Sequence, residues 1–171
     1  VEPATSLLGS DVSYVKWKAD ARAFQTLAGI VFAGRVMLGT IDPIGESSSA
    51  DLPVTKLFFA GGSGTVRGYA YQHLGPTDAE GNPLGGTSLL LGSGEMRFPI
   101  YQALSGVVFV DAGQISVEPW TWKPGELLYA AGPGLRYGTP LGPVRLDVGF
   151  PINPPKDTPS VQVWLSIGHA F

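Results

Sequence analysis

The stretch VSYVKWKADARAF, residues 12–24, changes character at every position. Even-numbered positions from 14 to 22 hold a tyrosine and four charged residues, and odd-numbered positions from 15 to 23 hold a valine, a tryptophan and three alanines. Because successive side chains of a β-strand point to opposite faces, this period of two predicts a strand with one wet and one apolar face. Its length is close to the roughly 9 to 11 residues that a tilted strand needs to cross a bilayer.

Similar alternation recurs, so that about seven strands are expected in all. The other segments are residues 27–41, 88–100, 103–114, 127–139, 143–150 and 161–171. Tight connections are expected at residues 25–26, 101–102 and 138–141, and long ones at residues 42–86, 115–126 and 153–159. A soluble β-sandwich also has alternating strands, so alternation alone leaves that alternative open. Short turns at one end and long loops at the other favour an outer-membrane barrel.

Composition excludes several classes of function. The net charge of −3 over 171 residues offers no basic surface for nucleic acid, and the absence of cysteine excludes disulfides and thiolate sites. No run of about 20 apolar residues predicts a transmembrane helix. The two histidines, His73 and His169, are far apart in the sequence, so no metal site, cofactor or histidine-based catalysis is predicted. Because the sequence starts at Val1 without a charged and apolar leader, we expect any secretory signal to lie upstream or to have been removed.

The long connection over residues 42–86 is too apolar at its centre to be a solvated linker. Residues 57–69 read LFFAGGSGTVRGY. The glycines at 61, 62 and 64 are not followed by the lysine of a phosphate-binding loop, so we interpret them as a tight turn. Apolar and aromatic side chains in such a loop should pack against another part of the protein, which in a wide barrel is the lumen.

Several motifs then occur in a distinctive order. They are FFAGG (58–62), VRGY (66–69), LGP (74–76), GG (85–86), Glu95, FVDAG (109–113), GPGLRYGTPLGPVRLD (132–147) and SIGHAF (166–171). Together they resemble the BamA/TamA superfamily of outer-membrane barrel-assembly and translocation proteins, most closely its TamA branch. The resemblance covers essentially the whole chain.

This resemblance implies that residues 1–171 are the C-terminal part of an all-β, antiparallel transmembrane barrel in the outer membrane of a Gram-negative bacterium. The chain would supply about the last eight strands of a sixteen-stranded barrel, with residues 42–86 folded into the lumen. POTRA domains would precede it and are absent from this sequence. An eight-stranded barrel has an interior that side chains just fill, so we expect upstream residues or a second chain to complete the wall.

The resemblance also places Arg67, with Gly68 and Tyr69, in the lumen against Glu95, Phe109 and Asp111. Strand parity independently puts the last three on one wet face. A planar guanidinium can bind a carboxylate through two hydrogen bonds while it stacks on a ring, which predicts a lock for the loop. Two carboxylates could instead serve in glycosidic acid/base catalysis, but nearby arginines favour a structural network. An ordinary loop-tip arginine is the other alternative.

The last strand carries two further candidates, Gly168 and the C-terminal Phe171. By resemblance, Gly168 marks a kink beside a weak seam, the lateral gate, and Phe171 resembles a signal read by the assembly machinery. The implied function is an insertase for outer-membrane proteins or autotransporters, and the alternatives are a two-partner secretion transporter and a passive porin. Expected partners are outer-membrane lipid, client proteins and an inner-membrane or periplasmic protein reached through the POTRA domains. No enzyme activity is predicted.

Parity further predicts which face meets lipid. Added cations should be costly at apolar positions such as Val110 and tolerated at the wet positions Ser93 and Ser105.

Overall fold

The computed structural model describes residues 2–4, 12–140 and 142–168. These form an eight-stranded sheet in which every strand pairs antiparallel with the next one along the chain. The strands are β1 (Glu2–Ala4), β2 (Tyr14–Leu27), β3 (Ile30–Pro43), β4 (Ser88–Tyr101), β5 (Leu104–Ser116), β6 (Leu128–Tyr137), β7 (Val144–Pro151) and β8 (Gln162–Ile167). No helix in the described parts of the chain is long and apolar enough to span a membrane.

The seven predicted strands are therefore confirmed as β2 to β8, although their ends differ from the prediction. The first turn was wrongly predicted at Gln25 and Thr26, which lie within β2. The chain turns instead at Ala28 and Gly29, whose φ angles of 50° and 81° are those of the tight hairpin turn that suits the twist of paired strands. Alternation indicates which face a residue occupies but not where its strand ends. The three-residue β1 was not among the strands predicted from alternation, but it brings the number to the eight that the family resemblance implied.

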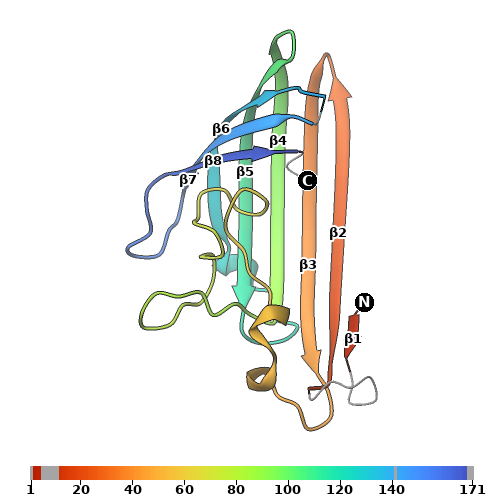
Figure 1. Ribbon diagram of the computed structural model, residues 1–171, viewed down its shortest axis with the longest axis vertical. Helices are drawn as coiled ribbons and strands as arrows, with labels where there is room; N and C mark the ends of the chain where they lie inside the picture. Colours follow the sequence, from red (N-terminus) through yellow and green to blue (C-terminus); the bar gives the residue numbers. More distant parts are fainter. Residues whose placement is uncertain (1, 5–11, 141, 169–171) are drawn as a thin grey trace.

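Connection lengths alternate as predicted. Figure 1 shows β2 to β5 as long ribbons side by side, whereas β6 to β8 tilt strongly across the molecule. Short connections join β2 to β3, β4 to β5 and β6 to β7, and long connections join β3 to β4, β5 to β6 and β7 to β8. The sheet has two edges, one at β8 and one beyond β2, where β1 pairs only with the first three residues of that strand.

The strand register groups the wet positions on one face. Glu95 on β4 lies opposite Phe109 on β5, which in turn lies opposite Gly132 on β6. Residues paired in this way project from the same side of a sheet. The other side is an exposed apolar face, and there the side chain of Leu165 on β8 is 75% exposed. The two faces match the parity that the sequence predicted.

The connection between β3 and β4, residues 44–87, covers the wet side of the sheet, which we call the covered face. Its Val66, Tyr69 and Leu74 are buried. They belong to one apolar cluster with residues of β3, β4 and β5, including Met37, Ile41, Leu89, Leu91 and Ile115. The loop contains two short 3₁₀ helices, η2 (Ser49–Asp51) and η3 (Val54–Lys56), before its apolar centre.

The break in the β6–β7 ladder coincides with a proline. Ala131 pairs with Phe150 and Gly134 with Asp147, but the two residues between Ala131 and Gly134 are not paired with β7. One of them, Pro133, has no N–H group to donate to a neighbouring strand. The strand predicted over this proline forms, with a local loss of pairing.

Candidate functional site

A tight turn in the loop brings Arg67 to the covered face. Gly61 and Gly62 both have φ of +104°, a conformation that favours glycine. The Gly62 N–H donates to the Tyr69 carbonyl at 3.0 Å and the Thr65 N–H donates to the Gly62 carbonyl at 3.1 Å. The chain therefore reverses within a few residues and presents Arg67 to the sheet. This agrees with the turn predicted over residues 61–64.

Asp111 on β5 binds Arg67 through three hydrogen bonds. Arg67 Nε donates to Asp111 Oδ2 and Nη2 donates to Oδ1, each at 2.7 Å. The backbone N–H of Arg67 donates to the same Oδ2 at 3.1 Å. Arg67 is only 2% exposed, so these charge-assisted bonds are largely removed from water. The carboxylate holds both the side chain and the backbone of the loop.

Glu95 and Phe109 complete the contacts predicted for Arg67. Arg67 Nη1 donates to Glu95 Oε1. The guanidinium carbon also lies 3.5 Å from the centre of the Phe109 ring, a stacked cation–π arrangement. Burial opposes the charged form of Arg67, but its hydrogen bonds to Asp111 and the charges of Asp111 and Glu95 outweigh burial, and the pKa of Arg67 is raised. The side chain stays charged at any physiological pH.

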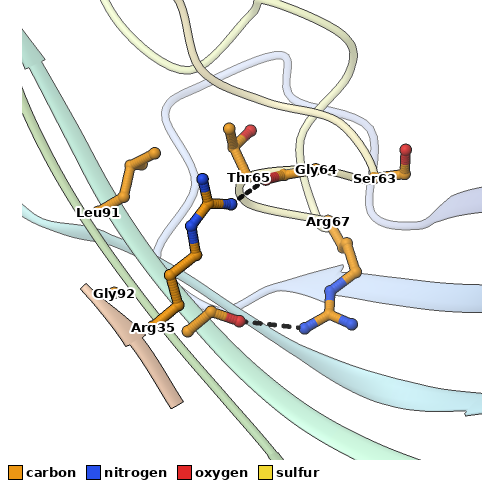
Figure 2. Close-up of a pocket in the computed structure, with 8 residues that line it drawn as sticks. Arg35, Ser63, Gly64, Thr65, Arg67, Leu91 and Gly92 are labelled. Carbon is orange, nitrogen blue, oxygen red and sulfur yellow. Dashed lines mark hydrogen bonds between the residues drawn. The ribbon is translucent and has the colours of Figure 1, made fainter. Parts of the chain in front are cut away.

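Ser93 also belongs to this site, which the sequence prediction missed. Its hydroxyl accepts from Arg67 Nη2 at 3.3 Å and donates to Asp111 Oδ1 at 2.5 Å. Figure 2 shows Arg67 entering from the loop and Arg35 reaching toward the loop from its strand, where Arg35 Nη1 donates to the Gly64 carbonyl at 3.2 Å. The prediction that Ser93 tolerates an added cation conflicts with this geometry, because the site already holds a buried arginine there.

The charges continue beyond Arg67 into a network that reaches β7. Glu95 also binds Arg97 at 2.7 Å and Arg136 at 3.3 Å. Asp147 binds Arg136 at 2.7 Å and Arg145 at 3.0 Å. If Arg67 is removed, Glu95 still binds two arginines. Of the contacts described here, Asp111 then keeps the hydrogen bond from the Ser93 hydroxyl. Asp111 is the carboxylate that depends most on the loop.

The loop backbone lies directly on β6 and β7, where glycines leave room for it. A methyl group at Gly149 would overlap the Arg67 carbonyl, and one at Gly68 would lie 2.9 Å from the Pro151 nitrogen. The adjacent Tyr69 is buried, and its hydroxyl donates to the Tyr129 carbonyl at 3.4 Å. The predicted Gly68 and Tyr69 thus both contact the sheet on the side of the ladder break where Ala130 pairs with Pro151.

Trp164 on β8 is a second contact that the sequence prediction missed. Its indole N–H donates to the Arg67 carbonyl at 2.7 Å, across 97 residues of chain. Parity places Trp164 among the wet positions of its strand, whereas the aromatic girdles of a membrane barrel lie on its outward face. That placement was the available signal, but alternation alone does not name a partner.

Of the two candidates at the end of the chain, one is described by the structure. Gly168 follows β8 with φ of +105°, and its N–H donates to the Pro143 carbonyl at 2.9 Å. The strand predicted over residues 161–171 ends at Ile167. Phe171 lies outside the described residues. Gly168 therefore takes a backbone conformation that favours glycine, and the kink and gate at this position stay a prediction.

The acidic residues of the site are held by arginines rather than grouped for metal binding. Within the described ranges, no group of three or more histidine, cysteine, aspartate or glutamate side chains is arranged to hold a metal. Glu95 and Asp111 are both buried and both accept from Arg67. The arrangement can fasten a loop to a sheet through charged hydrogen bonds.

Comparison with known proteins agrees with this architecture. The family model described as the Omp85 superfamily domain matches residues 1–171. The outer membrane protein assembly factor BamA of Nitratidesulfovibrio vulgaris is 30% identical over an alignment of 156 residues, and the match covers 88% of this chain and 19% of that protein. The outer envelope protein 80 of Arabidopsis thaliana chloroplasts is 37% identical over an alignment of 104 residues, and the match covers 56% of this chain and 13% of that protein.

Among solved structures, BamA from Haemophilus ducreyi lacking POTRA domains 1–3 superposes with a TM-score of 0.74 at 22% identity, covering 91% of this chain and 35% of that chain. The sheet thus has the fold of part of a BamA barrel, and the predicted bacterial outer-membrane location is confirmed. This chain spans about a fifth of the length of its BamA relative. The names of these relatives describe an assembly factor and outer envelope proteins rather than enzymes.

Proposed function

This chain belongs to the Omp85 superfamily, and from that premise we propose that it is the gate-bearing part of a barrel that inserts and assembles other outer-membrane proteins. The observation that carries the proposal is the edge of the sheet at β8. Among the described residues, β8 pairs with β7 over only six residues, whereas β2 and β3 have fourteen residues each. A short strand at an edge is the part of a sheet most easily opened.

An open edge can template a strand of a client protein. The outward N–H and C=O groups of β8 would pair with an incoming strand by β-augmentation. Val163, Leu165 and Ile167 are exposed on the apolar face, so the new strand would be formed at lipid depth. The backbone groups supply the hydrogen bonds, and no covalent chemistry is needed. Clients would be other outer-membrane proteins or autotransporters.

The remaining details of the assignment are part of the proposal. We place residues 1–171 as the C-terminal half of a sixteen-stranded barrel, with residues 42–86 inside the lumen and POTRA domains upstream. The charged contacts of Arg67 would keep the loop inside. The TamA branch is proposed on the motifs alone, and the number of POTRA repeats in the full-length protein tests that placement.

Crosslinking tests the seam. Single photoreactive or cysteine probes would replace Val163, Leu165 or Ile167 in the full-length protein, and matched probes would replace Val108 or Val110 on β5. All five positions are exposed on the apolar face. Adducts to a client during its assembly are expected from β8 and not from β5, because β5 is paired on both sides. Adducts spread evenly over both strands would contradict a gate at β8.

A secretion conduit is the second candidate, and the docked loop is the observation that favours it over a passive porin. A loop that fills the covered face would close a pore until it moves. Planar-bilayer conductance separates these functions, since a porin should be open constitutively. A nearly closed wild-type barrel that opens when Arg67 is replaced fits both loop-plugged functions, and client adducts at β8 then distinguish the assembly factor.

A further inference from the structure

Arg67 joins two parts of the sheet that are otherwise distant. Its guanidinium is held by Asp111 on β5 and Glu95 on β4. Its backbone carbonyl accepts a hydrogen bond of 2.7 Å from the indole N–H of Trp164 on β8. Between β5 and β8 the sheet order inserts β6 and β7. One loop residue therefore spans the covered face from the middle of the sheet to its edge strand.

The contact with Trp164 is set up by the surrounding backbone. The Arg67 carbonyl lies so close to β7 that a side chain at Gly149 would overlap it. A buried carbonyl needs a donor, and the indole supplies one. The ring also lies next to the loop turn, since its Cη2 atom would be 3.8 Å from a methyl group at Gly62. Trp164 thus binds the Arg67 end of the turn and lies beside its Gly62 end.

We infer that Trp164 is a positioning residue that latches the gate strand to the docked loop. The β8 edge becomes available when the loop leaves the covered face, and an opened β8 in turn loosens the loop. Coupling of this kind is reciprocal, because both events break the same hydrogen bond. The inference rests on the proposed function, because a latch on β8 has a purpose only if β8 is a gate. Its test measures hydrogen exchange of the barrel itself.

The latch depends on the N–H group rather than on the bulk of the ring. Trp164→Phe keeps an aromatic ring and removes the donor. Trp122→Phe is the matched control, because the Trp122 indole also donates to a backbone carbonyl, that of Leu89 at 3.1 Å, but in a different loop. The full-length protein in lipid nanodiscs is compared by hydrogen–deuterium exchange of the β8 amides, with the β2–β3 hairpin as the internal reference.

Trp164→Phe should raise exchange of β8 about fivefold, which corresponds to about 1 kcal/mol for one hydrogen bond. Exchange of the loop residues 58–69 should rise with it. Trp122→Phe should leave both unchanged. Unchanged exchange of β8 in Trp164→Phe, or an equal rise in Trp122→Phe, would overturn the latch.

A second comparison remains informative if Trp164→Phe folds poorly. Arg67→Ala alters no residue of β8. It should still raise β8 exchange, because the undocked loop carries the carbonyl of residue 67 away from Trp164. In the Arg67→Ala background, Trp164→Phe should add little, since the two changes break one connection. Fully additive effects would show that Trp164 acts independently of the loop and would refute the inference. Raised β8 exchange with normal client assembly would support the latch while contradicting the proposed role of the gate.

Discussion

Replacement of Arg67 tests how the loop is held. Arg67→Lys keeps one positive charge but cannot reproduce the two 2.7 Å bonds to Asp111 together with the stacking over Phe109. A hydrogen bond to a charged group contributes about 1.5 to 3 kcal/mol, and a cation–π contact about 1 kcal/mol. If the ammonium retains one bond, docking should weaken by about 2 to 4 kcal/mol, roughly 30- to 700-fold in the ratio of docked to undocked loop.

Arg67→Ala should be more damaging, because it also leaves Asp111 without a cation. Removal of one partner from a buried pair costs about 3 to 5 kcal/mol, and a wet lumen would reduce that value. Adding Asp111→Asn to Arg67→Ala should then recover part of the loss, since the stranded charge is removed. Adding Glu95→Gln to Arg67→Ala should not recover loop docking in the same way, because Glu95 still forms ion pairs with Arg97 and Arg136.

Protease access to the loop in folded full-length barrels is the assay. Chymotrypsin suits it, because the aromatic sites at Phe58, Phe59 and Tyr69 are unchanged in every variant, whereas trypsin would lose its site at position 67 in Arg67→Ala. Arg22→Ala is the control, since Arg22 pairs with Asp20 at 2.9 Å with its side chain 46% exposed, and such surface pairs contribute little to stability. Equal protection in wild type, Arg67→Lys and Arg67→Ala would refute the lock.

Three further predictions concern the exposed apolar face, the contact of the loop with β7 and the end of β8. Val110→Arg on the exposed apolar face should destabilise the barrel in lipid by about 2 to 4 kcal/mol, and Ser105→Arg on the covered face should destabilise it much less. Urea unfolding from vesicles measures both, and equal effects would contradict the membrane orientation. Gly149→Ala should undock the loop by about 1 to 3 kcal/mol, while Gly92→Ala, whose methyl group meets nothing within 4 Å, should leave chymotrypsin cleavage unchanged. Gly168→Ala should cost about 1 to 2 kcal/mol because φ is +105° there, and an unchanged thermal midpoint would argue against the kink.

Strand positions and faces were predictable because their signal is local. The side-chain period of two repeats along each strand whatever its partner is, so the sequence placed Glu95, Phe109 and Asp111 on one face before any register was known. The turn at Ala28 and Gly29 was missed for the same reason. A period describes the interior of a strand, whereas a pair of positive φ angles decides where it ends.

The site shows where local information stops. That Arg67 meets Asp111 was expected from family resemblance, because parity alone does not say which loop residue reaches which strand. Ser93 and Trp164 entered the site only through the ladder register, which aligns Ser93 with Asp111 and Trp164 with Asp147.

The sequence by itself determined the all-β class, the two faces and the alternation of short and long connections, since each follows from side chains close together in the chain. Only the tertiary structure decided that Arg67 carries two connections, one through its guanidinium to Asp111 and one through its carbonyl to Trp164. These partners lie 44 and 97 residues away. Sheet register and the backbone space left at Gly149 bring these residues together, and neither can be inferred from the local pattern of residues.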